Sequence, residues 1–149
     1  MPVSLYKPKV HFYFEQKGFS LENRNQLKRF IEGIFAKEKK RLSHINYIFC
    51  SDKRLLEINR QFLNHDFYTD IIAFDLSEGR ETEAEIYISI DRVRENSESL
   101  RYSFKSELHR VIFHGALHLC GYKDKKRSDI DKMRERESFY LSKYGINGI

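Results

Sequence analysis

The residues best suited to chemistry lie in one short stretch from Phe113 to Asp124, which reads Phe-His-Gly-Ala-Leu-His-Leu-Cys-Gly-Tyr-Lys-Asp. His114 and His118 are four positions apart, so on an α-helix they lie one above the other on the same face and can reach one ion. Gly121 predicts the end of that helix, after which the chain can turn back and offer Asp124 as a third ligand. Three such ligands leave a tetrahedral ion one open position for water.

A histidine pair of this spacing also occurs by chance or as hydrogen-bonded core residues. The flanking apolar residues, the glycine break and the nearby carboxylate favour the metal site. Position 115 is glycine, where helix-borne zinc proteases carry a glutamate base, and this argues against peptide hydrolysis of that type. Glu107 lies about two turns before His114 on the same face. We therefore expect it to accept a histidine N–H or assist proton transfer, or else to be a helix-surface charge.

The composition predicts one globular domain over residues 1–149, with hydrophobic residues at 40% and charged residues at 33%. The formal net charge of +5 favours a polyanionic partner, although lysine-rich solvated faces give the same balance. Two cysteines give no disulfide framework, no apolar run is long enough to cross a membrane, and the start of the chain lacks the core of a signal peptide. We expect a soluble, unexported protein of the reducing cytoplasm.

Apolar periodicity predicts the elements that position this stretch. We expect an α+β fold in which a mixed four-stranded sheet packs against helices, one of them a zincin-like helix carrying the His-x-x-x-His pair. The wholly apolar run from Ile71 predicts a strand covered on both faces that closes a second βα crossover, and Ser128 to Asp131 has the spacing of a capping box. The predicted strands are Val10–Phe14, Ile45–Cys50, Ile71–Leu76 and Ala84–Ile90, and the predicted helices are Leu21–Lys40, Ser51–Phe62, Asp91–Leu100, Phe104–Cys120 and Ser128–Leu141.

The stretch that begins at His114 resembles the signature of the YbeY-type rRNA maturation endoribonucleases, which reads His-Gly-x-Leu-His-Leu-x-Gly-Tyr-Asp-His. Upstream, Leu56 to Asn59 resembles the family's Glu-Leu-Asn segment, and Thr69 to Phe74 its Thr-Asp-Val-Leu-Ser-Phe segment. Ala84 to Ser89 resembles its Gly-Asp-Ile-x-Ile-Ser strand. The resemblance covers the chain from about Ile45 to Tyr140.

This resemblance implies a cytoplasmic bacterial, metal-dependent, single-strand-specific endoribonuclease. It would act in maturation of small-subunit ribosomal RNA and in ribosome quality control, with ribosomal RNA, the ribosome and ribosomal proteins as partners and no membrane. The family's first two metal ligands fall on His114 and His118, and its third histidine falls on Asp124. A carboxylate makes the ligand set harder, so we expect one Zn²⁺, a less acidic bound water, and a drift in preference toward Mn²⁺, Fe²⁺ or Ni²⁺.

The chain departs from the family again at Leu63, where the family carries an arginine thought to act on the RNA phosphate. Arg60 or His65 is a candidate for the missing cation, although Arg60 also suits an exposed helix position. Around the metal site, Lys123, Lys125, Lys126 and Arg127 are candidates to hold phosphates, while Tyr122 or Phe67 offers a ring for base stacking; a solvated loop with a core tyrosine is the alternative.

The expected reaction is phosphodiester cleavage in which the ion polarises a phosphoryl oxygen and activates either water or the substrate's 2′-hydroxyl. Two alternatives remain open. A non-haem iron oxygenase also uses two histidines and a carboxylate, and a ribosome-associated RNA-binding protein would hold a structural metal. A structural site needs a fourth ligand, for which Cys120 is the nearby candidate, although Cys120 also suits a small buried apolar position.

Overall fold

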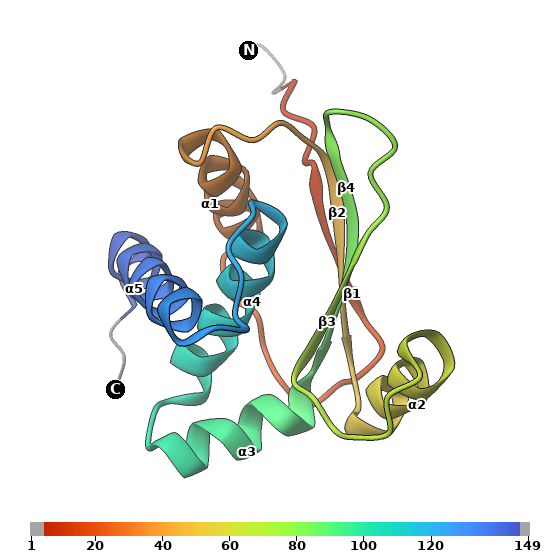
Figure 1. The fold of residues 1–149 in the computed structure, drawn as a ribbon. Coiled ribbons are helices and arrows are strands. Elements are labelled where there is room, and N and C mark those ends of the chain that lie inside the picture. Colours follow the sequence, from red (N-terminus) through yellow and green to blue (C-terminus); the bar gives the residue numbers. More distant parts are fainter. Residues whose placement is uncertain (1–4, 147–149) are drawn as a thin grey trace.

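A four-stranded sheet in the order β1-β2-β4-β3 forms the middle of the molecule, and the computed structural model describes residues 5–146 (Figure 1). The sheet is mixed: β1 and β4 each pair in parallel with β2, and β3 pairs antiparallel with β4. The strands are β1 (Val10–Phe14), β2 (Leu42–Cys50), β3 (Ile71–Asp75) and β4 (Thr82–Ser89).

Helices cover both faces of the sheet unequally. On one face lie α1 and α4, with α5 packed on the outer side of α4, while α2 covers part of the opposite face and α3 runs below the sheet (Figure 1). The predicted α+β class with a mixed four-stranded sheet is confirmed. The helices are α1 (Arg24–Lys37), α2 (Asp52–Leu63), α3 (Ile90–Leu100), α4 (Phe104–Leu119) and α5 (Arg127–Tyr144).

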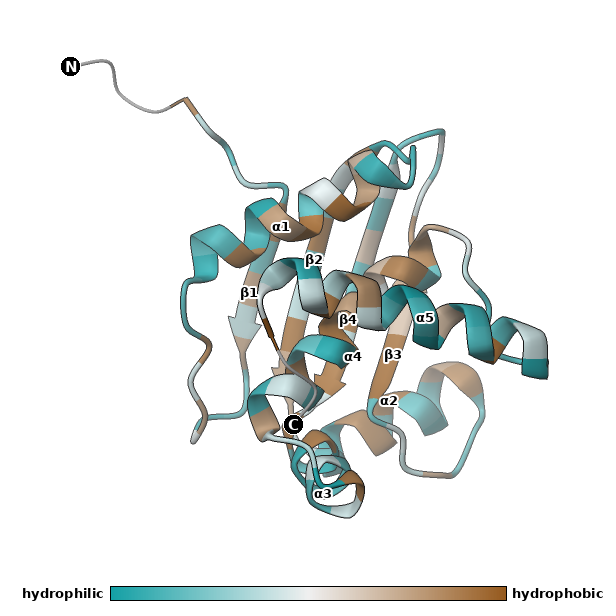
Figure 2. Ribbon diagram, turned by 90° about the vertical axis from the view of Figure 1, so that its left-hand side faces the viewer, coloured by the Kyte–Doolittle hydropathy of each residue, from teal (hydrophilic) through white to brown (hydrophobic). Residues whose placement is uncertain are grey.

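Helix α4 lies between the sheet and α5, and it is apolar because both sides are covered. Val111, Ile112 and Leu117 are at most 1% exposed, and the strands behind the helix are apolar along their central residues (Figure 2). The hydroxyl of Tyr47 on β2 donates to the carbonyl of Ile112 at 2.9 Å, which satisfies both buried groups. The helix that carries His114 is therefore fixed from the sheet side.

Two local predictions need correction. The apolar run of β3 has both faces partly covered, since Ile72 lies in the cluster under α2 while Ile71 and Ala73 pack toward α4. However, β3 is an edge strand that runs antiparallel to β4. The strand that pairs in parallel with β2 is β4, so the predicted parallel crossover connects β2 to β4 and not to β3. Helix α5 begins at Arg127 with Lys126 as its N-cap and without a side-chain capping bond, so the capping box predicted from Ser128 was wrong.

At Gly115, helix α4 packs closely against side chains of the sheet. A Cβ atom at this position would lie 3.0 Å from the Cδ1 atoms of both Ile71 and Ile86. The glycine in the His-Gly-x-Leu-His pattern therefore has a packing reason, because it lets the helix settle against β3 and β4 directly beside His114.

We predict that Gly115→Ala destabilises the fold by about 1 kcal/mol, because overpacking of about 1–3 kcal/mol exceeds a gain in helix propensity of at most about 1 kcal/mol. Gly33→Ala in α1 is the matched control. Among residues 5–146, no atom outside α1 lies within 4 Å of the added Cβ, so only the propensity gain should remain. Urea unfolding of both variants measures the difference; equal stabilisation by the two substitutions would contradict the close approach.

Candidate metal and active site

The end of α4 has the geometry that Gly121 predicts. Gly121 has a φ of 108°, and its N–H donates to the carbonyl of His118 at 3.0 Å. The N–H of Tyr122 donates to the carbonyl of Leu117 at 3.1 Å, which completes a Schellman motif. Only glycine adopts this left-handed conformation without strain, and the motif turns the chain back toward the face of α4 that carries the histidines.

Glu38, at the end of α1, anchors the turn that follows. Its carboxylate accepts hydrogen bonds from Tyr122 at 2.8 Å, from Arg136 at 2.6 Å and from the hydroxyl of Tyr140. Burial acts to raise the pKa of Glu38, but these hydrogen bonds outweigh it, so the pKa lies below its usual range. The carboxylate thus joins α1, α5 and the start of the 121–126 turn.

His114 is held by carboxylates on both ring nitrogens. Its Nδ1 lies 2.6 Å from Oε2 of Glu137 on α5, and its Nε2 lies 3.5 Å from Oδ2 of Asp124 in the turn. Burial acts to raise the pKa of Glu137, but the hydrogen bond from His114 and the charge of Arg110 lower it below its usual range. An ionised carboxylate only accepts, so Nδ1 of His114 carries the proton of this hydrogen bond, and Nε2 is the ring nitrogen on the side of Asp124.

Of the three predicted ligands, the structure brings His114 and Asp124 together. His118 is exposed one helical turn further along α4, and Asp124 has 48% of its side chain exposed. Within residues 5–146, no set of three His, Cys, Asp or Glu side chains is gathered closely enough to enclose an ion. The donor types suit a divalent metal. The imidazole of His114 is oriented by Glu137, and the other two donors, His118 and Asp124, are exposed on the same side of α4.

Glu107 contacts Arg110, not a histidine. The Arg110 guanidinium donates from Nε and Nη2 to the two Glu107 oxygens at 2.9 and 2.6 Å, and from Nη1 to Oε1 of Glu137 at 3.0 Å. The side chains of Glu107 and Glu137 are 0% and 3% exposed. Glu107 was expected to accept a histidine N–H, but both of its oxygens bind Arg110. Glu137 is the carboxylate that contacts His114.

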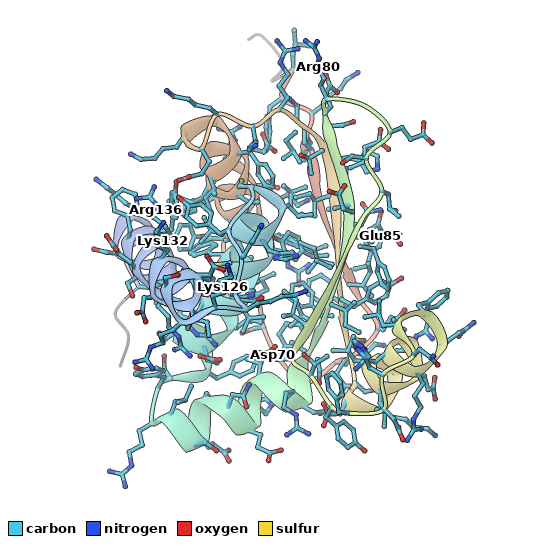
Figure 3. The ribbon with its side chains drawn as sticks, in the orientation of Figure 1. Asp70, Arg80, Glu85, Lys126, Lys132 and Arg136 are labelled. Carbon is cyan, nitrogen blue, oxygen red and sulfur yellow. The ribbon has the colours of Figure 1, made fainter. Side chains whose placement is uncertain are left out.

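Sequence analysis missed Glu137 and Asp70. Glu137 falls in the buried stripe of α5 with Met133, Tyr140 and Leu141, and a carboxylate within an apolar stripe was the available signal. Asp70, labelled in Figure 3, immediately precedes β3 and is partly buried. Burial raises the pKa of Asp70, while the charges of Arg110 and His114 oppose that rise.

The two candidate substitutes for the family arginine, Arg60 in α2 and His65 in the loop before β3, each contact a residue of that loop. Arg60 forms an ion pair with Asp66, and the ring of His65 stacks on Phe67 with centroids 5.1 Å apart. The structure does not join either residue to the His114 cluster, and Leu63 is half-exposed with no polar group to offer. Asp70, at the end of the same loop, is near enough to His114 for the two charges to interact.

The three predicted substrate lysines, Lys123, Lys125 and Lys126, lie exposed in the turn that carries Asp124; Figure 3 labels Lys126. None of them forms a salt bridge with a carboxylate in the described part of the chain. Arg127, by contrast, lies 3.5 Å from Asp131. The lysines are thus free to meet an anion beside the candidate metal ligands.

Cys120 lies in the hydrophobic core at 7% exposure, and burial raises the pKa of its thiol to about 12. Cys120 therefore occupies the small, buried apolar position that the sequence also allows for it.

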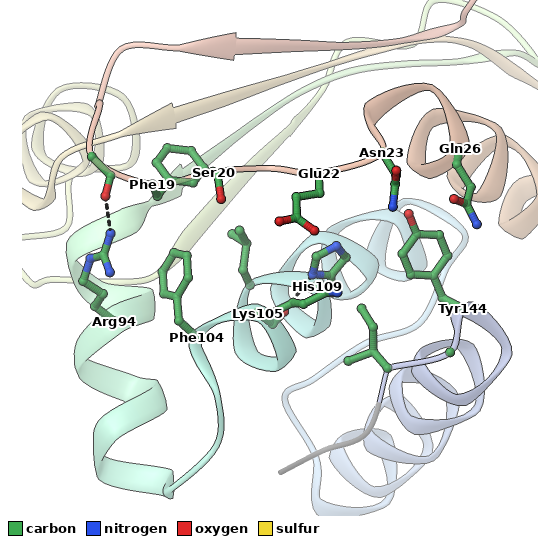
Figure 4. A pocket seen from close by; sticks show the side chains of 14 residues that line it. Phe19, Ser20, Glu22, Asn23, Gln26, Arg94, Phe104, Lys105, His109 and Tyr144 are labelled. Atoms are coloured by element: carbon green, nitrogen blue, oxygen red, sulfur yellow. Dashed lines mark hydrogen bonds between the residues drawn. The ribbon is translucent and has the colours of Figure 1, made fainter.

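A large cavity lies elsewhere in the molecule. Its volume is about 740 Å³, and Figure 4 shows it between the loop that precedes α1, the beginning of α4 and the end of α5. Its wall includes His109, whose Nδ1 bonds to the carbonyl of Lys105 and whose pKa is lowered by burial. None of the predicted metal ligands lines it.

Comparison with known proteins identifies the family. Residues 11–145 match the family model described as Endoribonuclease YbeY. An Endoribonuclease YbeY of Cytophaga hutchinsonii is 46% identical over 89% of this chain and 94% of its own, and that of Flavobacterium psychrophilum is 45% identical over 86% and 91%. The solution structure of TM1509 from Thermotoga maritima aligns with a TM-score of 0.62, 28% identity and 91% coverage of both chains.

The sequence match thus places the chain in a class of RNA-cleaving hydrolases. The chain belongs to the YbeY endoribonuclease family. No helix within residues 5–146 is long and apolar enough to cross a membrane.

We predict that Glu38→Gln lowers the free energy of unfolding by about 2 kcal/mol at pH 7, because hydrogen bonds to a charged acceptor are lost. The folded-state pKa of Glu38 is below its ordinary value of 4.5, so this stabilisation is present above pH 4.5 and is lost as pH falls through the folded-state pKa. Urea unfolding from pH 7 to pH 3 measures the difference between the variant and wild type. Glu135→Gln, an exposed change on α5, is the control. A difference that persists undiminished at low pH would disprove the charged role of Glu38.

Proposed function

We propose that this chain is a metal-dependent endoribonuclease that cleaves single-stranded RNA in ribosomal RNA maturation, with one divalent ion held by His114, His118 and Asp124. Zn²⁺ is the expected ion, and the harder carboxylate ligand shifts preference toward Mn²⁺, Fe²⁺ or Ni²⁺. The observation that supports this most is the 3.5 Å approach of Asp124 to Nε2 of His114, in a chain of the YbeY endoribonuclease family.

The ion, when bound, would supply Lewis-acid stabilisation of the phosphoryl oxygens and would lower the pKa of the attacking water or 2′-hydroxyl. The residues of this chain have supporting tasks. His114 presents Nε2 because its Nδ1 is occupied by Glu137. Asp124 and His118 are exposed, so an RNA strand can reach the side of α4 on which they lie.

Substrate binding is assigned to the turn before α5 and to the loop before β3. Lys123, Lys125 and Lys126 are exposed cations that suit successive phosphates. Of the two candidate rings, the Tyr122 hydroxyl donates to Glu38, whereas Phe67 is 55% exposed. Phe67 is therefore the better stacking surface for an unpaired base, which also explains a preference for single strands.

The proposal extends to the cellular setting that the family resemblance implies. The enzyme would act in the cytoplasm on the small ribosomal subunit, including its quality control, in contact with ribosomal proteins. A closed structural metal is disfavoured because His118 and Asp124 are exposed, which leaves an ion bound there open to solvent and substrate.

The direct test is cleavage of a single-stranded RNA by wild type, by His114→Ala and by the chelated protein. Loss of a metal ligand should reduce the cleavage rate by at least about a hundredfold, and added Zn²⁺ or Mn²⁺ should restore the chelated wild type only. His11→Ala, which removes a half-buried histidine on β1, is the matched control and should cleave normally. Undiminished cleavage by His114→Ala would refute the proposal.

For the lysines, we predict that Lys125→Glu with Lys126→Glu weakens binding of single-stranded RNA. It should also reduce the slope of log affinity against log salt concentration by about 1.4, because two phosphate contacts are lost. Lys17→Glu with Lys53→Glu makes the same charge change at exposed positions outside the turn and should alter the slope less. Binding isotherms in chelator at several salt concentrations measure both; equal slopes for the two double variants would exclude the turn as the phosphate site.

A further inference from the structure

The α4–α5 interface contains an ionic cluster of Glu107, Arg110 and Glu137 in which two carboxylates share one guanidinium. Arg110 has 17% of its side chain exposed, and the two carboxylates are almost inaccessible. With Arg110 balancing one acid, the ionised cluster keeps one net negative charge. Burying such a charge costs desolvation free energy unless a cation or a strong hydrogen bond compensates for it.

That remaining charge is directed at His114. Oε1 of Glu137 accepts from Arg110, which leaves Oε2 at 2.6 Å from Nδ1 of the imidazole. Glu107 in turn fixes Arg110 through both of its oxygens. The three side chains therefore form an ordered series in which each one restricts the orientation of the next, and His114 is the last member.

We infer that Glu137 is a positioning residue for the metal ion, which fixes His114 as the Nδ1–H tautomer and directs Nε2 to the ion. A carboxylate behind a ligating imidazole makes the ring a stronger donor and lowers the entropy lost on binding. The metal part of this inference depends on the proposed function, whereas the tautomer part concerns the metal-free protein alone. Arg110 and Glu107 support Glu137 without contacting the ring.

The two buried glutamates offer a matched pair of variants. Glu137→Gln and Glu107→Gln make the same chemical change, both beside Arg110, but only Glu137 contacts His114. A glutamine amide at position 137 can donate as well as accept, so it no longer dictates which ring nitrogen carries the proton. Glu137→Asp keeps the charge but is one methylene shorter, and it serves as a second variant if Glu137→Gln does not fold.

The first measurement is the ¹⁵N shifts of the His114 ring in the metal-free proteins at about pH 8, where an ordinary histidine is neutral. Wild type and Glu107→Gln should show the Nδ1–H tautomer, and Glu137→Gln should show a substantial Nε2–H population. The second is Zn²⁺ affinity by competition with a chromophoric chelator. Glu137→Gln should bind about 10–100-fold more weakly than wild type, and Glu107→Gln should stay within about threefold, since the Nδ1 acceptor remains.

The inference is overturned if Glu137→Gln, or Glu137→Asp in its place, keeps both the wild-type tautomer and affinity, or if Glu107→Gln loses as much affinity as Glu137→Gln. The second result would mean that the cluster acts only through general stability. If wild type itself binds no Zn²⁺ at micromolar concentration, the proposed function fails, and the tautomer comparison still decides the role of Glu137.

Discussion

Two carboxylates buried against one guanidinium form the interaction on which the candidate site depends. Glu107 and Arg110 lie on α4 and Glu137 lies on α5, so the cluster fixes how these helices meet. A buried charge that loses its partner costs several kcal/mol, which leaves few alternative arrangements of the interface. Because His114 stands at the end of this cluster, its orientation is set by the packing of the helices rather than by local rotamer preference.

The other side of α4 is set by close packing. Gly115 lets the helix approach Ile71 and Ile86, and the Tyr47 hydroxyl holds the carbonyl of Ile112. The turn after α4 is then held by Glu38 through Tyr122, which brings Asp124 toward Nε2 of His114. His114 and Asp124 thus approach each other because three independent contacts, with the sheet, with α5 and with α1, act on one helix and its following turn.

Much of this arrangement could be predicted from the sequence where the signal is local. The spacing of His114 and His118, the break at Gly121 and the apolar periodicity gave the α4 helix and its turn, and β1 occupies its predicted range. The contacts of Glu137 and Asp70 could not be predicted by spacing, because partners so distant in the chain are set by tertiary packing. The same limit explains the error on β3, since an apolar run does not reveal whether its neighbour is parallel or antiparallel.

The central claim is that His114, His118 and Asp124 hold one metal ion, and anomalous scattering from crystals grown with Zn²⁺ tests it most directly. We expect a single strong peak per chain, bonded to Nε2 of His114, to His118 and to a carboxylate oxygen of Asp124, with Glu137 still hydrogen-bonded to Nδ1 of His114. A peak bound away from these residues, or coordination of His114 through Nδ1, would contradict it.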